Sequence, residues 1–372
     1  MLSLFVANVA SLAFSVAIPG LQGKPKTSND DEVFLTKDVV TTVAVTGATG
    51  RTGRLVVEEL LKRDVSRIVA VVRDESKAAE VFPNPPENLQ IIQCDLTNAK
   101  DIGKALKDVD AAIWCATGFS DAQNSPLVKL QRLFNLAFTP RQSIDAVGIP
   151  SVASCLLDNQ KSIIKQKTEF AFPKLVMLSS AGVTRTSWDE NKRERFRGAS
   201  DIPIVRLNPF NILDVKRESE EKLRASGIDY CIVRPCGLND DWPAGSRPVF
   251  SQGDVAVGRI NRKDVADVLV DVLSTPEATG KTFEAVGLAG YPKARSIRPA
   301  LSRLLKDKDG PPSEDSIAMT YNTLQQLLPG EKQDSASLAM GQTYEQLDRG
   351  ETGRLGKRGE EDAAAAAPKP SS

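Results

Sequence analysis

The sequence contains no histidine among its 372 residues. This absence excludes a Ser-His-Asp triad, a Cys-His dyad, a histidine metal ligand and any imidazole acid–base group. Chemistry performed by this chain must therefore use lysine, tyrosine, serine, threonine, cysteine, carboxylates or a bound cofactor.

Cysteine is scarce as well, with five residues and no Cys-x-x-Cys pair. Cys94, Cys115 and Cys231 stand inside apolar runs, where cysteine usually behaves as a small buried hydrophobic residue. The spacing indicates neither a disulfide framework nor a zinc site, and we expect no metal centre.

An excess of charge of either sign is also missing, because Lys plus Arg and Asp plus Glu both number 48. The net charge therefore gives no indication of nucleic-acid binding. Apolar residues make up 41% of the chain, which is enough for the core of one large α/β domain with appendages.

Residues 2–20 are apolar and rich in serine and alanine, and no charge precedes Lys24. This length suits a signal peptide better than a membrane span, although a basic segment is missing at the start. The Ser-Leu-Ala-Phe sequence at 11–14 resembles the bipartite plastid presequence of algae with secondary plastids. We expect residues 1–30 to direct the chain to a plastid, with the secretory pathway or the cytoplasm as alternatives. A disordered apolar start or an uncleaved anchor is the competing interpretation, and no membrane span is expected in the mature chain.

The most informative segment is the glycine-rich sequence TTVAVTGATGRTG at residues 41–53. A short apolar run ends in Gly47, Gly50 and Gly53, and a helical pattern opens at about Arg54. Such glycines allow a sharp turn, close approach of a pyrophosphate and close packing of the helix on the strand. The phosphates would lie on unpaired N–H groups at the helix N-terminus. The segment therefore predicts dinucleotide binding, and a glycine-rich turn without a ligand is the alternative.

Apolar strands and amphipathic helices alternate after this turn. Strands are expected at 68–72, 89–94, 111–115, 174–178, 230–233 and 282–286, and helices at 55–63, 100–106, 218–225, 263–274 and 313–328. This alternation predicts an α/β fold of the Rossmann type, with a doubly wound, mostly parallel sheet and right-handed crossovers.

Changes in composition along the chain predict its organisation. The expected parts are a targeting segment at 1–30, an NAD(P)-binding Rossmann domain at 38–295, a helical extension at 296–348 and a disordered tail at 349–372. Within the Rossmann domain, residues 119–142 look like an insertion. The charged and then proline-punctuated residues 184–208 look like a surface loop or lid.

Further segments match one family in order and spacing. They are Thr46–Gly53, Val72–Asp74, Cys94–Leu96, Ala116–Gly118, Asp145–Gly148, Leu178–Gly182, Lys216, Val233–Pro235 and Arg262–Ala266. Through these segments the chain resembles the atypical short-chain dehydrogenase/reductase family, in its NmrA-like NAD(P)-binding branch. The segments that begin at Asn208 and Arg234 resemble plastid and cyanobacterial members, including photosystem II assembly or translation factors and a translocon-associated dehydrogenase-like protein.

The resemblance implies a cofactor-binding role for residues that follow the expected strands. The pyrophosphate would be held by Gly47, Thr49, Gly50, Arg51, Thr52 and Gly53. The adenosine ribose would meet Arg73, the adenine would lie between Asp95 and Leu96, and the cofactor would be lined by Ala116 and Thr117. The nicotinamide would lie near Ser179 and Ser180, its ribose would be reached by Lys216, and the loop over the carboxamide would begin at Pro235.

The chain departs from the typical family at the catalytic centre. The Tyr-x-x-x-Lys motif would place a tyrosine four residues before Lys216, where this chain has Ile212, and none of its four tyrosines has a lysine four residues later. A phenol beside an ammonium group can donate a proton near neutral pH, whereas isoleucine has no proton to give. Lys216 and Ser180 are the remaining candidates for a catalytic role.

Most candidates also have a purely structural interpretation. Arg73 would pair with the 2′-phosphate of NADP(H), because NAD-specific folds carry an acid at this point. A solvated surface arginine is the alternative there, and NAD(H) is the alternative cofactor. Lys216 fits a solvated helix face equally well, and Ser179 and Ser180 fit the cap of a turn. The run at 193–197 fits an anion site or a solvated loop.

Two functions are consistent with these residues. The first is an NAD(P)(H)-binding protein that lacks the catalytic tyrosine and acts as an assembly or regulatory scaffold in a plastid, with protein partners held through the C-terminal extension. The second is an active NADPH-dependent oxidoreductase on a small carbonyl or quinone substrate. The missing tyrosine and the extension favour the first function. Hydride transfer is the chemistry of the cofactor itself, which keeps the second open.

Overall fold

The computed structural model describes residues 34–117, 144–162, 170–208 and 211–327. Eight strands form one sheet in the order β3-β2-β1-β4-β5-β6-β10-β8, parallel throughout except for the antiparallel pair β10 and β8. The strands span Thr42–Thr46 (β1), Arg67–Val72 (β2), Leu89–Gln93 (β3), Ala111–Trp114 (β4), Leu175–Leu178 (β5), Tyr230–Pro235 (β6), Ser246–Ser251 (β8) and Lys281–Pro292 (β10). A second sheet pairs β7 (Gly237–Leu238) with β9 (Arg259–Ile260).

The central strands are buried on both faces, which explains their continuous apolar sequences. Every residue of β1 is buried. Val43 and Val45 contribute to the apolar cluster on one face of the sheet, whereas Ala44 contributes to the cluster on the other. Ile68 and Val69 of β2 divide between the two clusters in the same way.

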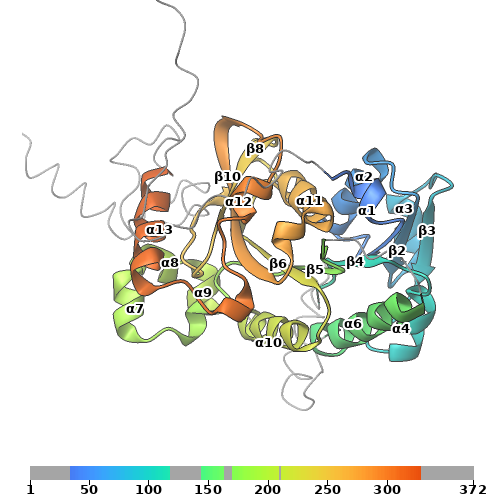
Figure 1. Cartoon of the computed structure of the whole chain (residues 1–372), viewed down its shortest axis with the longest axis horizontal. Helices are drawn as coiled ribbons and strands as arrows, with labels where there is room; N and C mark the ends of the chain where they lie inside the picture. Colours follow the sequence, from blue (N-terminus) through green and yellow to red (C-terminus); the bar gives the residue numbers. More distant parts are fainter. Residues whose placement is uncertain (1–33, 118–143, 163–169, 209–210, 328–372) are drawn as a thin grey trace, which may run out of the picture. The chain divides into compact units, whose positions relative to one another are not determined.

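Long helices cover both faces. α2 (Gly53–Lys62) packs against α11 (Arg262–Asp271) on one face. On the other face, α6 (Ile144–Ser162) contacts both α4 (Ala99–Ala105) and α10 (Ile212–Ala225). Figure 1 shows α4, α6 and α10 in a row along one side of the sheet and α2 and α11 on the opposite side. The doubly wound Rossmann-type fold predicted from the sequence is therefore confirmed.

Further helices complete the described residues. They are α1 (Thr36–Val39), α3 (Glu75–Val81), α7 (Glu190–Arg195), α8 (Arg197–Ser200), α9 (Pro203–Leu207), α12 (Arg298–Leu301) and α13 (Glu314–Leu327), with 3-10 turns η2 (Arg185–Ser187), η4 (Val272–Ser274), η5 (Pro276–Ala278) and η6 (Asp307–Asp309). The expected insertion at 119–142, the targeting segment at 1–30 and the tail at 349–372 lie outside the residues that the structure describes.

The elements that were not expected include α6 and β8. α6 contains Gly148 and Pro150, which both disfavour a helix interior, so its helical pattern is weak in the sequence. β8 contains Pro248, which a strand tolerates at the edge of a sheet because one row of its backbone groups faces outward. The other expected elements are present, and α10 begins at Ile212, earlier than its charged stretch indicated.

Residues 184–208 form short helices, so the prediction of a surface loop or lid was wrong. Trp188 and Phe196 are buried in a small apolar cluster that includes Ile317 of α13. Lys192 and Arg195 both lie within 3.5 Å of the Glu314 carboxylate at the start of α13. The charged run around Phe196 therefore contributes to the packing of the C-terminal helix.

Candidate functional site

The strand order changes direction between β1 and β4. β2 and β3 continue the sheet from β1, whereas β5 and β6 continue it from β4. The chain leaves β1 toward α2 on one face of the sheet, and the next described helix after β4 is α6 on the other face. In open α/β sheets, ligands bind outside the carboxyl ends of the strands at such a switch point.

The glycine turn lies at the carboxyl end of β1. Gly47 has a positive φ of 65°, and a Cβ there would lie 2.8 Å from Cα of Ala116, which follows β4. A Cβ on Gly53 would lie 2.2 Å from the carbonyl oxygen of Gly47. A side chain at Gly47 would therefore collide with the residues after β4, and one at Gly53 would collide with the turn itself.

The start of α2 lies directly after the glycine turn. Thr52 makes no side-chain cap hydrogen bond, so the first N–H groups of the helix have no side-chain acceptor from their cap residue. Gly50 and Arg51 are exposed beside it, and Thr49 is half-buried. Backbone N–H groups and the helix dipole at this end favour a pyrophosphate.

Arg73 follows β2 directly and is exposed. The neighbouring Asp74 is occupied as the cap of α3, since its carboxylate accepts hydrogen bonds from the backbone N–H groups of Ser76 and Lys77 at 2.9 and 3.2 Å. One oxygen of the carboxylate after β2 therefore caps the helix.

The residues after β3 and β4 lie at the same edge. Asp95 is exposed, and hydrogen bonds from the backbone N–H and hydroxyl of Thr97 hold the pKa of its carboxyl below the ordinary value. Leu96 is half-buried, Ala116 is buried against the glycine turn, and Thr117 is exposed.

Trp114 fixes the helix that follows. Its indole N–H donates to the Asp145 carboxylate at 2.8 Å, and its ring lies so close to Gly148 that a Cβ there would be 2.4 Å away. Trp114 is fully buried. α6 is thus held against the carboxyl half of β4.

Lys216 is buried, so the interpretation as a solvated helix-face lysine was wrong. Its ammonium group donates to the carbonyl oxygen of Leu178 at 3.4 Å, at the carboxyl end of β5. Burial raises the pKa of the nearby Cys115 thiol to about 12, although the Lys216 charge opposes this shift. The lysine therefore lies between the ends of β4 and β5, and Cys115 is a neutral thiol.

Ser179 belongs to a buried ionic network. Its hydroxyl donates a hydrogen bond to the Glu220 carboxylate at 2.5 Å. The same carboxylate accepts hydrogen bonds from Nε and a terminal nitrogen of Arg234 in β6, and another from Arg224. Burial by itself would raise the pKa of Glu220, but the two guanidinium groups and the Ser179 hydroxyl hold it below the ordinary value. The network joins α10 to β5 and β6.

Ser180 and Pro235 complete the predicted positions. Ser180 is half-buried, and its hydroxyl donates to the carbonyl oxygen of Ala181 at 2.9 Å. Pro235 is the buried last residue of β6 and pairs in register with Ala285 of β10. The structure thus brings the predicted residues to the carboxyl ends of β1 to β6, and directs the Ser179 hydroxyl into the protein.

Sequence reasoning missed the pair that holds the loop after β5. The Asp254 carboxylate accepts hydrogen bonds from the backbone N–H groups of Gly182 and Thr184. The second member of the pair, Arg185, is fully buried, and its guanidinium donates to the carbonyl oxygens of Asp254, Ala199 and Ala256. Asp254 lies about 70 residues from Gly182 and Arg185 in the sequence, so no local sequence pattern could predict these contacts.

No described tyrosine replaces the missing proton donor. The Tyr230 hydroxyl donates to Asp307, and burial together with that carboxylate raises its pKa. The Tyr321 hydroxyl accepts from the Gly198 backbone N–H, and Tyr291 is exposed at the end of β10. Tyr344 lies outside the described residues.

The switch point, the glycine turn and the start of α2 define a dinucleotide-binding protein of the Rossmann class. Residues 47–276, more than half of the chain, match a family model described as NAD(P)H-binding. The chain belongs to this NAD(P)H-binding family.

Its curated relatives include several chloroplastic proteins. An uncharacterized chloroplastic protein of Arabidopsis thaliana is 32% identical over 253 residues, which cover 68% of this chain and 78% of that protein. The chloroplastic protein TIC 62 of Pisum sativum is 25% identical over 292 residues, which cover 73% of this chain but only 45% of that protein. Sanguinarine reductase of Eschscholzia californica is 23% identical over 259 residues, which cover 65% of this chain and 88% of that protein.

The chain is also similar to solved structures. The oxidoreductase ylbE from Lactococcus lactis is 18% identical with a TM-score of 0.48, covering 71% of this chain and 96% of that chain. A short-chain dehydrogenase/reductase from Veillonella parvula in complex with NADP is 14% identical with a TM-score of 0.47, covering 69% of this chain and 99% of that chain. In the described part of this chain, no helix is long and apolar enough to cross a membrane.

Proposed function

We propose that this protein binds NADP(H) at the carboxyl ends of β1 and β4 and acts in a plastid as a dinucleotide-dependent assembly or regulatory protein. The turn at Gly47 and Gly53 and the start of α2 support binding of the pyrophosphate. The exposed Arg73 supports preference for the 2′-phosphate of NADP(H). The chloroplastic relatives support the plastid.

One observation carries the assignment of a role other than efficient reduction. Lys216 is buried where it reaches the end of β5, and the position one helical turn before it holds Ile212. Of the Tyr-x-x-x-Lys motif, the chain therefore has the lysine, Lys216, whereas the tyrosine that would donate a proton is replaced by Ile212. General acid catalysis is typically worth about 10²–10⁴ in rate, so its loss leaves only slow turnover.

An active reductase is the second candidate. The half-buried Ser180 hydroxyl follows β5 close to Leu178, whose carbonyl accepts from Lys216, and supplies an exchangeable proton at this edge. The relative named sanguinarine reductase supports this possibility at the level of the family. Substrates in this case would be small carbonyl or quinone compounds. NADPH would supply a hydride, and the oxygen anion would take one proton from water, either directly or through Ser180, which water then reprotonates.

Two measurements on the full chain test the proposal. Calorimetric titration is expected to show binding of NADPH, and an NADPH oxidation assay over a panel of quinones and carbonyl compounds is expected to show little or no turnover. Turnover of about one per second or faster on any compound would replace the regulatory assignment by the reductase. Absence of NADPH and NADH binding would overturn both candidates.

A matched pair of variants tests the reason for low turnover. Ile212→Tyr adds a phenol four residues before Lys216, whereas Ile212→Phe adds the same ring without a hydroxyl. We expect Ile212→Tyr to raise NADPH oxidation above both wild type and Ile212→Phe. An equal change in the two variants would show that ring volume, not a proton donor, controls the rate.

A further inference from the structure

A cavity of about 510 Å³ lies at the edge of the sheet opposite the glycine turn. It opens to the surface and is lined by residues of α1, of the C-terminal ends of α2 and α11, and of the segment 293–298 that follows β10. α1 precedes β1, and the end of α2 leads to the start of β2, so these elements mark the amino ends of the strands. The cavity is therefore separate from the candidate dinucleotide site.

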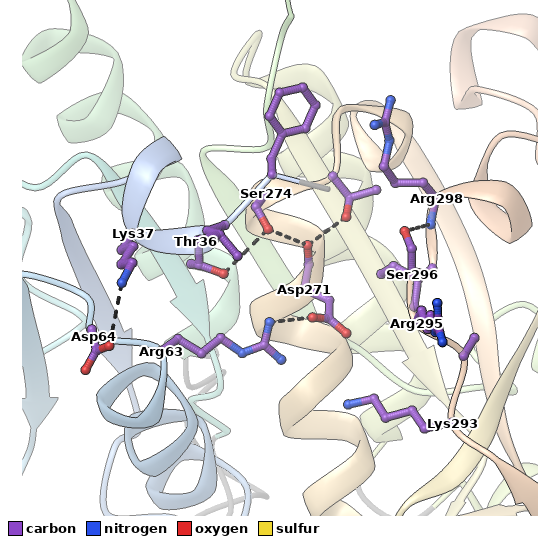
Figure 2. A pocket seen from close by; sticks show the side chains of 15 residues that line it. Thr36, Lys37, Arg63, Asp64, Asp271, Ser274, Lys293, Arg295, Ser296 and Arg298 are labelled. Atoms are coloured by element: carbon purple, nitrogen blue, oxygen red, sulfur yellow. Dashed lines mark hydrogen bonds and ion pairs between the residues drawn. The ribbon is translucent and has the colours of Figure 1, made fainter. Parts of the chain in front are cut away.

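Cationic side chains predominate in the lining of this cavity. Its charged lining residues are Lys37, Arg63, Lys293, Arg295 and Arg298 against Asp64 and Asp271. Figure 2 shows Lys37 and Arg63 approaching from one side and Lys293 and Arg295 from the other. Thr36, Ser274 and Ser296 lie among them (Figure 2). Thr275 also lines the cavity, and the hydroxyls of Ser274 and Thr275 donate to the carbonyl oxygen of Asp271 at 3.3 and 2.7 Å.

Several of these cations retain capacity for a ligand. Arg295 is exposed and forms no ion pair or hydrogen bond within the residues that the structure describes. Lys37 lies 3.7 Å from Asp64, and both side chains are largely exposed, so this pair is weak. Arg63 donates Nε to Glu59 and one terminal nitrogen to Asp271, which leaves other N–H groups of its five.

Compensation of helix dipoles explains only part of this arrangement. Lys37 and Arg63 stand at helix C-termini, where cations are favoured. Lys293 and Arg295 belong to the segment between β10 and α12, which ends no helix. The ammonium group of Lys293 donates to the Asp267 carboxylate at 2.5 Å, and the Arg298 guanidinium donates to Glu277 through two nitrogens. These ion pairs hold the segment 293–298 against its neighbours.

We propose that this cavity is a second binding site, for a small molecule that carries phosphate groups. Guanidinium and ammonium groups that converge from several elements are donors that phosphate oxygens prefer. The volume lies in the range of metabolite-sized ligands and exceeds that needed for a single inorganic ion. Because the site lies at the opposite edge of the sheet, it does not depend on the dinucleotide proposal.

The test uses tripolyphosphate as the probe and the full chain in calorimetric titration. Arg295→Glu reverses an exposed charge without a described partner and is expected to weaken binding about tenfold or more, as loss of a charged hydrogen bond predicts. Lys37→Gln is expected to weaken binding to a smaller extent. Arg303→Glu is the matched control, because Arg303 is exposed nearby and does not line the cavity.

Arg51→Glu at the glycine turn distinguishes the two edges of the sheet. Because tripolyphosphate can also bind at the glycine turn, the proposal expects Arg51→Glu to retain the cavity site. Adding Arg295→Glu to it should then weaken binding about tenfold or more, whereas adding Arg303→Glu should change binding by no more than about twofold. Loss of binding in Arg51→Glu with none in Arg295→Glu would place the probe at the turn and overturn the proposal. Equal losses in all variants, or no binding to wild type, would overturn it as well.

Discussion

The ammonium group of Lys216 donates to the carbonyl oxygen of Leu178 across 3.4 Å, which places a buried cation at the carboxyl end of β5. Ile212 begins the same helix one turn earlier and is half-buried. The helix thus presents a lysine, but no phenol, to the region where the family resemblance places the nicotinamide ribose.

Lys216→Met is expected to weaken NADPH binding about tenfold, because a charged hydrogen-bond donor is replaced by a thioether. Binding of 2′,5′-ADP, which lacks the nicotinamide half, is expected to change little. Lys222→Met is the control on the same helix, since Lys222 forms only an exposed pair with Glu218. Calorimetry with both ligands checks this. Equal losses for both ligands would place Lys216 away from the nicotinamide.

Arg73→Glu is expected to reduce the preference for NADPH over NADH by about tenfold or more, because a charge-assisted bond to the 2′-phosphate becomes a repulsion. Arg67→Glu is the matched control, since Arg67 begins the same strand at the opposite edge of the sheet. The ratio of the two dissociation constants is the measured quantity. An unchanged ratio in Arg73→Glu contradicts the prediction.

Gly53→Ala is expected to destabilise the fold strongly, because the new Cβ would lie 2.2 Å from a backbone oxygen that cannot move independently. Gly103→Ala in α4 is the opposite case: no atom lies within 4 Å of its Cβ, and alanine favours a helix interior by about 0.5–1 kcal/mol. The urea concentration at the midpoint of unfolding should therefore fall in Gly53→Ala and rise in Gly103→Ala. A stable Gly53→Ala protein would show that the turn and α2 can separate.

Glu220→Gln is expected to lower the free energy of unfolding by about 3–5 kcal/mol, because it leaves Arg234 buried beside a neutral amide. Glu218→Gln, in the same helix but exposed, is expected to change it by less than about 0.5 kcal/mol. Chemical denaturation of both variants gives the comparison. A small effect of Glu220→Gln would mean that solvent reaches the network.

Stability should fall as pH rises from about 4.5 to about 7 through the contribution of Glu284. Burial, with the nearby Asp254 charge, raises the pKa of this carboxyl from 4.5 to about 7 in the folded protein. The folded state therefore binds more protons than the unfolded state in this range, and the free energy of unfolding decreases with pH. Glu284→Gln is expected to flatten the slope, and Glu221→Gln, at an exposed position, to leave it unchanged. An unaltered slope in Glu284→Gln would contradict the assignment.

Local sequence determined the first half of the fold. The apolar run before Gly47 and the three-glycine spacing specify β1, the turn and α2, because each requirement is met by residues adjacent in the chain. The same holds for Ile68–Val72, whose continuous apolar character follows from burial on both faces. The division into a domain at 38–295, an extension at 296–348 and flanking segments stays a prediction, as do the individual cofactor contacts.

Tertiary structure decided the environment of the polar residues. The sequence gives Lys216 the appearance of a surface lysine, because its helix is charged, yet the packing of α10 against the sheet buries it. The Ser179 hydroxyl is committed to Glu220, and Arg185 to the loop around Asp254, by contacts between residues far apart in the chain. Burial and charge pairing depend on which elements meet in space, and local patterns do not contain that information.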